Sequence, residues 1–265
     1  MADVRDWRNL SWPEFEGLDP ARTIALQPVG AVEQHGPHLP VGVDAIIAEA
    51  IARQAAARVR GEGAILILPT TQVGKSTEHI GFPGTLTLGA ATLTALWSEI
   101  GDSVARAGLR KLVFLNAHGG QPQVMEIVAR EMRVRHGLLA LASGWWSVGL
   151  PEGLFPESEM RHGIHAGAVE TAMMLHLAPE LVRMDRAQNF APATACVAEA
   201  YSRLRMVGPM QIGWMAQDLH PSGAAGDATL ATAALGRALV EDVALRYAEL
   251  LEEVAAYPLD AIKTR

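Results

Sequence analysis

The sequence predicts an α/β protein with a mostly parallel central sheet that is covered by helices on both faces. Short apolar segments at 23–29, 64–68, 111–115 and 138–142 are typical of buried strands, and segments with a helical apolar period lie between them. Strands and helices that alternate at this spacing favour a parallel sheet built from right-handed crossovers. Because no repeat, low-complexity tract or linker divides the chain, we expect one domain over residues 1–265.

The expected helices follow the strands, and two of them are closed by glycine, at Gly108 and Gly137. They span residues 44–60, 90–107, 123–136, 166–177 and 227–256. The segment 144–164 contains the adjacent residues Trp145 and Trp146, which favour a lid or pocket wall as much as an edge packing cluster or subunit contact. Residues 186–225 show few regular signals, and we expect irregular structure there.

Composition excludes several classes of function. The net charge is −7 and no basic block is present, so a nucleic-acid interface is not expected. A single cysteine rules out an internal disulfide and a cysteine-rich zinc site. The chain lacks both a signal-peptide core near Met1 and a run of about 18 apolar residues, so we expect a cytoplasmic protein without membrane contact.

Acidic and histidine side chains follow the ends of two expected strands. Glu33 and His35 come after the first, and His118 comes after the third. Ligands of open α/β sheets gather beyond the carboxyl ends of the strands, and residues two apart in extended backbone point to the same side. Asp44 stands where the chain enters a helix, and Gly119 lets the backbone approach a ligand closely. Carboxylates with imidazoles suit zinc, manganese or iron. On spacing alone, such side chains are more often hydrogen-bonded loop residues than metal ligands.

Four ordered sequence blocks within roughly residues 20–180 resemble the creatininase family. They are Glu-Gln-His-Gly-Pro-His-Leu-Pro at 33–40 followed by Asp44, Gly-Phe-Pro-Gly-Thr at 81–85, Asn-Ala-His-Gly-Gly at 116–120, and His-Ala-Gly with Glu-Thr at 165–171. The resemblance implies a three-layer α/β/α fold and an amidohydrolase that cleaves carbon–nitrogen bonds other than peptide bonds, in a non-peptide or cyclic amide. It also implies a small-molecule amide substrate and a homo-oligomer, often a hexamer.

The resemblance further implies a two-metal site with two divalent ions per chain, Zn or Mn, with Fe possible. The positions that match family ligands are Glu33, His35, the bridging Asp44 and His118. Creatinine-hydrolysing members carry a further acidic ligand two residues after the second histidine, where this chain has Gly120, so we expect Glu170 to complete the centre and to share in catalysis. His165 matches the family's catalytic histidine. The expected reaction is attack by a metal-activated hydroxide, after which His165 protonates the leaving nitrogen.

Side chains near this site are expected to bind substrate. They are Glu78, His79, Gly119, Trp145 and Trp146. Glu78 and His79 could instead orient a metal ligand or form a hydrogen-bonded pair that braces their loop.

Two alternative functions stay open. Gly120 disfavours creatinine itself, which leaves a peptidase or deformylase branch acting on a small modified peptide or a formamide. The second alternative is a metal-stabilised binding or assembly protein without turnover. His165 argues against it, because a structural metal site needs no proton donor.

Overall fold

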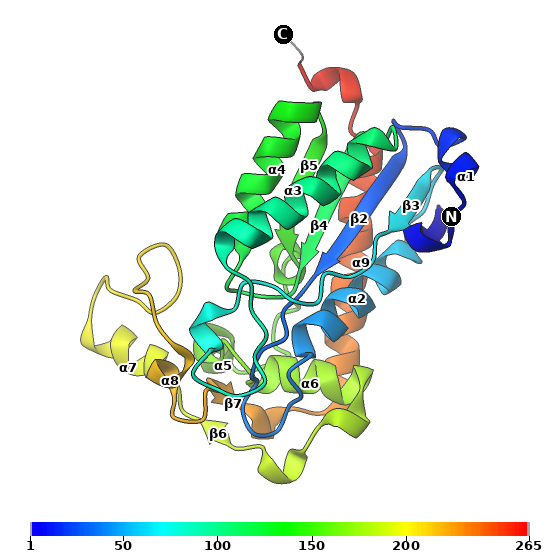
Figure 1. The fold of residues 1–265 in the computed structure, drawn as a ribbon. Coiled ribbons are helices and arrows are strands. Elements are labelled where there is room, and N and C mark those ends of the chain that lie inside the picture. The colour runs from blue at the N-terminus through cyan, green and yellow to red at the C-terminus, as the bar shows by residue number, and fades with distance from the viewer. Residues whose placement is uncertain (1, 264–265) are drawn as a thin grey trace.

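Five parallel strands form the central sheet of the computed structural model, which describes residues 2–263 (Figure 1). The strand order is β1-β3-β2-β4-β5, and every pairing within this sheet is parallel. The strands are β1 (Asp3–Asp6), β2 (Thr23–Val29), β3 (Ala64–Ile67), β4 (Lys111–Asn116) and β5 (Leu139–Gly144). The predicted parallel α/β sheet is therefore confirmed.

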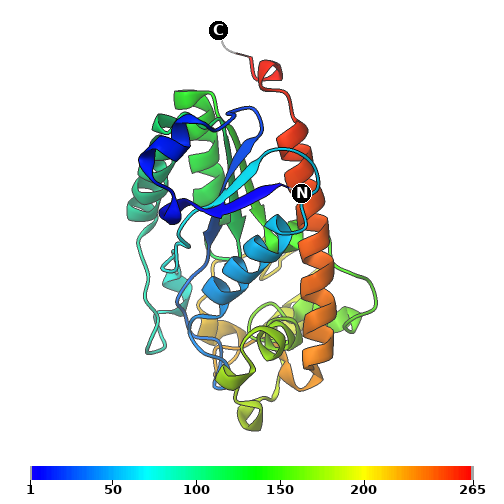
Figure 2. The same ribbon diagram turned by 90° about the vertical axis from the view of Figure 1, so that its right-hand side faces the viewer.

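Helices cover both faces of this sheet, as Figures 1 and 2 show. One face carries α2 (Val43–Ala56), α6 (Ala168–Leu177) and α9 (Ala233–Ala256), and the other carries α3 (Ala90–Arg106) and α4 (Pro122–His136). The sheet with its two helical layers gives the three-layer arrangement that the sequence predicted.

Alternation along the strands divides the core between the two faces. Ile24 and Leu26 of β2 pack with α2, α6 and α9, whereas Ala25 between them packs with α3 and α4. Neighbouring side chains of a strand point to opposite faces, so a strand covered on both sides is buried along its length and is mostly apolar. All seven residues of β2 are buried for this reason.

A buried lysine joins the sheet to the last helix. Lys111 opens β4, and its Nζ donates hydrogen bonds of 2.7–2.9 Å to the carbonyl oxygens of Val254, Ala255 and Tyr257. A cation is favoured at the carboxyl end of a helix, where carbonyl groups lack helical partners. Burial lowers the pKa of Lys111. This contact fixes α9 along the sheet.

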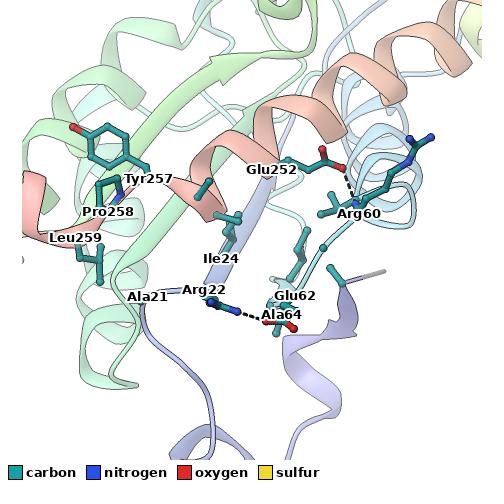
Figure 3. Close-up of a pocket in the computed structure, with 17 residues that line it drawn as sticks. Ala21, Arg22, Ile24, Arg60, Glu62, Ala64, Glu252, Tyr257, Pro258 and Leu259 are labelled. Atoms are coloured by element: carbon teal, nitrogen blue, oxygen red, sulfur yellow. Dashed lines mark hydrogen bonds and ion pairs between the residues drawn. The ribbon is translucent and has the colours of Figure 1, made fainter.

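A cavity of about 450 Å³ lies beside this end of α9 (Figure 3). Three of its charged side chains, those of Arg22, Glu62 and Glu252, have partners in the protein. Arg22 forms an ion pair with Glu62, and the backbone N–H of Arg60 donates to Glu252 at 2.7 Å. None of the possible metal-binding groups found among residues 2–263 includes a residue that lines it. The cavity sits by the amino ends of β2 and β3, away from the predicted site.

Several elements differ from the sequence prediction. The final helix begins at Ala233 and not at residue 227, because Thr232 Oγ1 accepts a hydrogen bond from the Leu235 N–H at 3.2 Å and caps the helix there. The short strand β1 was not predicted. The regions expected to be irregular contain further short elements. The remaining α-helices and strands are α1 (Trp12–Glu16), α5 (Glu157–His162), β6 (Asn189–Phe190), α7 (Ala193–Ala200), α8 (Ala216–Leu219) and β7 (Gly226–Asp227), and short 3-10 turns connect several elements.

The sequence predicted no membrane-spanning helix. Within residues 2–263, every helix is too short or too polar to cross a bilayer.

Candidate metal centre

The carboxyl ends of β2 and β4 bring four predicted ligands together. Glu33 and His35 lie in the segment after β2, Asp44 in the first turn of α2, and His118 directly after β4. Each is at most 3% exposed. His118 Nδ1 lies 3.1 Å from Glu33 Oε2 and 3.2 Å from Asp44 Oδ2. Asp44 Oδ1 lies 3.2 Å from His35 Nε2, so this carboxylate stands between two imidazoles.

The other two predicted residues approach the same point from α6 and the segment before it. Glu170 lies in the first turn of α6, with Oε2 3.9 Å from His35 Nε2. His165 Nδ1 lies 3.7 Å from Glu33 Oε1, and the His165 ring lies 4.3 Å from the His35 ring, measured between centroids. Two groups of three have ligand atoms within 4.8 Å of one another: Glu33 with His35 and Asp44, and His35 with His165 and Glu170.

This donor set fits divalent cations. His35 Nε2 and Asp44 Oδ2 are both buried, and neither has a hydrogen-bond partner. Buried polar atoms without partners are rare because their desolvation is not compensated. A cation between an imidazole nitrogen and a carboxylate oxygen would satisfy both atoms, and this mixture of ligands suits zinc and manganese.

Backbone carbonyls orient the two imidazoles. His35 Nδ1 lies 3.0 Å from the Glu33 carbonyl oxygen, and His118 Nε2 lies 2.9 Å from the Lys75 carbonyl oxygen. A ring nitrogen that donates to a carbonyl leaves the other nitrogen free to bind a cation. The free nitrogens are His35 Nε2 and His118 Nδ1, and both face Asp44.

The crowded carboxylates and imidazoles shift each other's pKa values. Burial works against a charged His35, yet Asp44, Glu170 and Glu33 raise its pKa to about 10. Burial is the main reason that the pKa of Glu170 rises to about 7. Burial also lowers the pKa of His165 well below its usual range, together with the nearby His35 ring. His165 is therefore neutral at neutral pH, while His35 holds a proton that an arriving cation must displace.

Glu78 fills the space that a side chain at position 120 would need. A Cβ added to Gly120 would lie 1.7 Å from Glu78 Oε1 and 2.5 Å from His118 Nε2. Glu78 Oε1 lies 3.3 Å from His118 Nε2, and Oε2 lies 2.8 Å from Lys75 Nζ. Burial would raise the pKa of Glu78, but His118 and Lys75 lower it to about 2. A carboxylate thus stands beside His118 even though residue 120 has no side chain.

Two polar residues in the centre extend the sequence prediction. His79, predicted to contact substrate, has Nε2 3.4 Å from Glu33 Oε1 and forms a third possible ligand group with Glu33 and His165. Gln34 was missed. Its Nε2 lies 2.8 Å from His79 Nδ1 and 3.1 Å from His165 Nε2, and it donates to the Gly223 carbonyl oxygen at 2.9 Å. Neighbouring side chains in extended backbone point to opposite sides, so Gln34 was expected to point away from its two neighbours. For this reason its position between two ligands did not mark it as part of the centre.

A cleft of about 900 Å³ opens over the centre. All five residues predicted to bind substrate line it: Glu78, His79, Gly119, Trp145 and Trp146. Trp145 also packs into the core, whereas Trp146 is 36% exposed. Ile212, Trp214 and Met215 form another part of the wall. The segment 186–225, which showed no clear pattern, therefore supplies apolar surface to the cleft.

The fold and the site together define a parallel α/β protein with a buried carboxylate–histidine centre under an open cleft. The family model described as Creatinine amidohydrolase matches residues 8–251, and the chain belongs to the creatininase family. It is accordingly a creatininase-family amidohydrolase.

Individual relatives carry two kinds of name. A mycofactocin precursor peptide peptidase from Mycobacterium ulcerans (strain Agy99) is 36% identical over 225 residues, which cover 82% of this chain and 80% of the relative. A creatinine amidohydrolase from Pseudomonas putida is also 36% identical, over 202 residues that cover 70% of this chain and 76% of the relative.

Solved creatininase structures share the fold. A mutant creatininase of Zn-Zn type superposes with a TM-score of 0.76 at 26% identity, covering 96% of this chain and 99% of that one. A manganese form of creatininase gives a TM-score of 0.74 at the same identity, covering 96% of this chain and 100% of that one.

Proposed function

We propose that this chain hydrolyses a carbon–nitrogen amide bond of a small peptide or peptide-derived molecule at a centre of two divalent ions. The observation that carries the proposal is the position of Asp44 between two oriented imidazoles, with unpartnered atoms on both Asp44 and His35. Glu33, Asp44 and His118 would hold one ion. His35, Asp44 and Glu170 would hold the other. When bound, such ions lower the pKa of water and polarise an amide carbonyl.

His165 supplies proton transfer in this proposal. Its neutral ring can accept a proton from the attacking water, and it can then give that proton to the leaving nitrogen, which departs poorly as an anion. The ring lines the cleft, with Nε2 2.7 Å from the Gln34 carbonyl oxygen and Nδ1 3.7 Å from Glu33 Oε1. The hydrogen bond to the Gln34 carbonyl oxygen orients the ring. A structural metal site would need neither this histidine nor an open cleft.

The cleft favours a peptide-type amide over a small cyclic one. Its volume of about 900 Å³ lies near the upper end of the ~300–1,000 Å³ range of ligand pockets. Trp146, Ile212 and Trp214 offer apolar surface that a small polar ring would leave uncovered. Four relatives at 31–36% identity are named mycofactocin precursor peptide peptidase. The second candidate is the non-peptide or cyclic amide that the sequence first indicated, which the Pseudomonas putida relative supports.

The test first measures the metal content of the protein and then supplies substrates of both classes. Elemental analysis of protein loaded with zinc or manganese should give close to two ions per chain. The loaded protein is then incubated with short peptides that carry apolar residues, with creatinine, and with N-formyl compounds, and mass spectrometry follows the products. We expect peptide cleavage that Asp44→Asn abolishes. Cleavage of creatinine alone would select the second candidate, and two bound ions with no cleavage in any arm would favour a binding protein.

A further inference from the structure

A buried carboxylate outside the metal centre belongs to Glu159 of α5. The residue is 6% exposed, and none of the ion pairs among residues 2–263 includes it. Its two oxygens accept backbone hydrogen bonds from separate segments. Oε1 accepts from the Ala168 N–H at 2.7 Å, and Oε2 accepts from the Asp227 N–H at 2.9 Å. A buried charge is costly unless it is hydrogen-bonded, so these two bonds are what keep the carboxylate in place.

The surrounding sequence leaves room for this carboxylate. Added Cβ atoms at Gly163, Gly167 and Gly226 would lie 2.3, 2.3 and 2.6 Å from Glu159 Oε1. Real Cβ atoms essentially never approach other atoms closer than 3.0 Å. Three separate positions therefore have to lack a side chain while the carboxylate is there. Gly226 also has a φ of +145°, which L side chains rarely adopt.

The segments that Glu159 joins are the ones that hold His165. His165 lies between Gly163 and Gly167, and its backbone pairs with Ala225, with N···O distances of 3.3 and 2.7 Å. The next residue, Ala166, has a φ of +53°, in the left-handed region that non-glycine residues seldom occupy. A strained segment keeps its conformation only when its surroundings hold it. Here Glu159 fixes the start of α6 through Ala168, and it fixes the segment that pairs with His165 through Asp227.

We propose that Glu159 is the positioning residue for His165: its carboxylate ties the start of α6 to the 225–227 segment and thereby fixes the imidazole over the metal centre. The inference rests on the proposed function, because that proposal assigns proton transfer to His165. The placement of the ring can nevertheless be measured without turnover. Glu159 does not line the cleft, and the hydrogen bonds of its carboxylate go to backbone N–H groups, so its effect passes through the backbone.

Glu159→Gln is the informative variant. The amide has the same size but carries one acceptor oxygen, so its NH₂ group must face either the Ala168 or the Asp227 N–H, donor against donor. Glu157→Gln is the matched control, because Glu157 lies two residues earlier on α5, has an 84% exposed side chain, and within residues 2–263 pairs only with Arg161. Ring signals in ¹⁵N-histidine NMR of zinc-loaded protein are assigned with His165→Ala. We expect Glu159→Gln to shift the His165 signals, and Glu157→Gln to leave them unchanged.

Kinetics give the second readout. Misplacement by about 1 Å can cost roughly 100-fold in rate, so we expect Glu159→Gln to lower kcat roughly 10- to 100-fold with KM and bound metal little changed. In the His165→Ala background, the same substitution should have no further effect. Equal losses in both backgrounds, or unchanged His165 signals, would overturn the inference.

If Glu159→Gln fails to fold, Glu159→Asp takes its place. The aspartate keeps the charge but is one methylene too short to reach both N–H groups, so it should shift the His165 signals in the same direction. If the wild-type protein turns over no substrate, the proposed function fails, and the NMR comparison alone decides the role of Glu159.

Discussion

Replacing Gly120 by alanine puts a methyl group into space that Glu78 already occupies. The new Cβ would lie 1.7 Å from Glu78 Oε1 and 2.5 Å from His118 Nε2, whereas ordinary contact begins near 3.4 Å. The carboxylate must therefore retreat by about 1.7 Å. It is the end of a flexible side chain, so we expect the fold to survive. The displaced carboxylate of Glu78 then disturbs its ion pair with Lys75 and its contact with His118.

The size of the effect follows from these contacts. Loss of a group that supports a metal-binding imidazole typically weakens metal binding roughly 10- to 100-fold, about 1.4–2.8 kcal/mol. We expect Gly120→Ala to lose zinc affinity in this range, measured by competition with a chromophoric chelator. Thermal unfolding of the same samples checks that the fold is intact. Gly119→Ala is the neighbouring control, since a Cβ at Gly119 meets nothing within 4 Å.

A double-mutant cycle decides whether the effect runs through Glu78. Once Glu78→Ala has removed the carboxylate, Gly120→Ala should cost much less affinity, because only the His118 contact is left. Zinc binding by Gly120→Ala as tight as in the wild type would refute the steric reasoning. An equal loss in both backgrounds would show that the glycine matters for another reason, such as its backbone.

Three further predictions concern metal, pH and packing. Asp44→Asn should bring bound zinc or manganese close to zero by elemental analysis, because Asp44 faces both imidazoles; retention of two ions would contradict the ligand assignment. In the metal-free protein, His35 has its pKa raised from 6.5 to about 10, so its contribution to stability is fully present below pH 6.5 and is lost as the pH rises through 10. Urea unfolding with chelator present should show that decline, and zinc affinity should rise over the same range as the competing proton leaves. Gly236→Ala would place a Cβ 1.8 Å from the Ala172 carbonyl oxygen where α6 meets α9, so we expect a loss of about 1–3 kcal/mol or more by urea unfolding, against less than about 0.5 for the exposed Leu245→Ala.

The sequence by itself determined the layers of the fold and six residues of the centre. Apolar strands and helical periods are local signals, and a parallel sheet must bury both faces, so the alternation of elements was enough to predict the sheet and its two helical layers. Glu33, His35, Asp44 and His118 were readable because their two blocks follow strand ends, where an open α/β sheet collects ligands. His165 and Glu170 were found through the resemblance of their block to the creatininase family. The three blocks are Glu33 to Asp44, His118 to Gly120, and His165 to Glu170.

Tertiary structure alone decided how these blocks are completed. Glu78 reaches the space beside Gly120 from a different loop, and Gln34 turns from between two ligands to contact His79 and His165. The strand β1 and the apolar wall at 212–215 had no local pattern, because neighbours far away in the chain determine their conformation. Local periodicity records which face of an element is buried. Which distant side chain fills a given space depends on contacts between elements, and no single segment of sequence encodes those contacts.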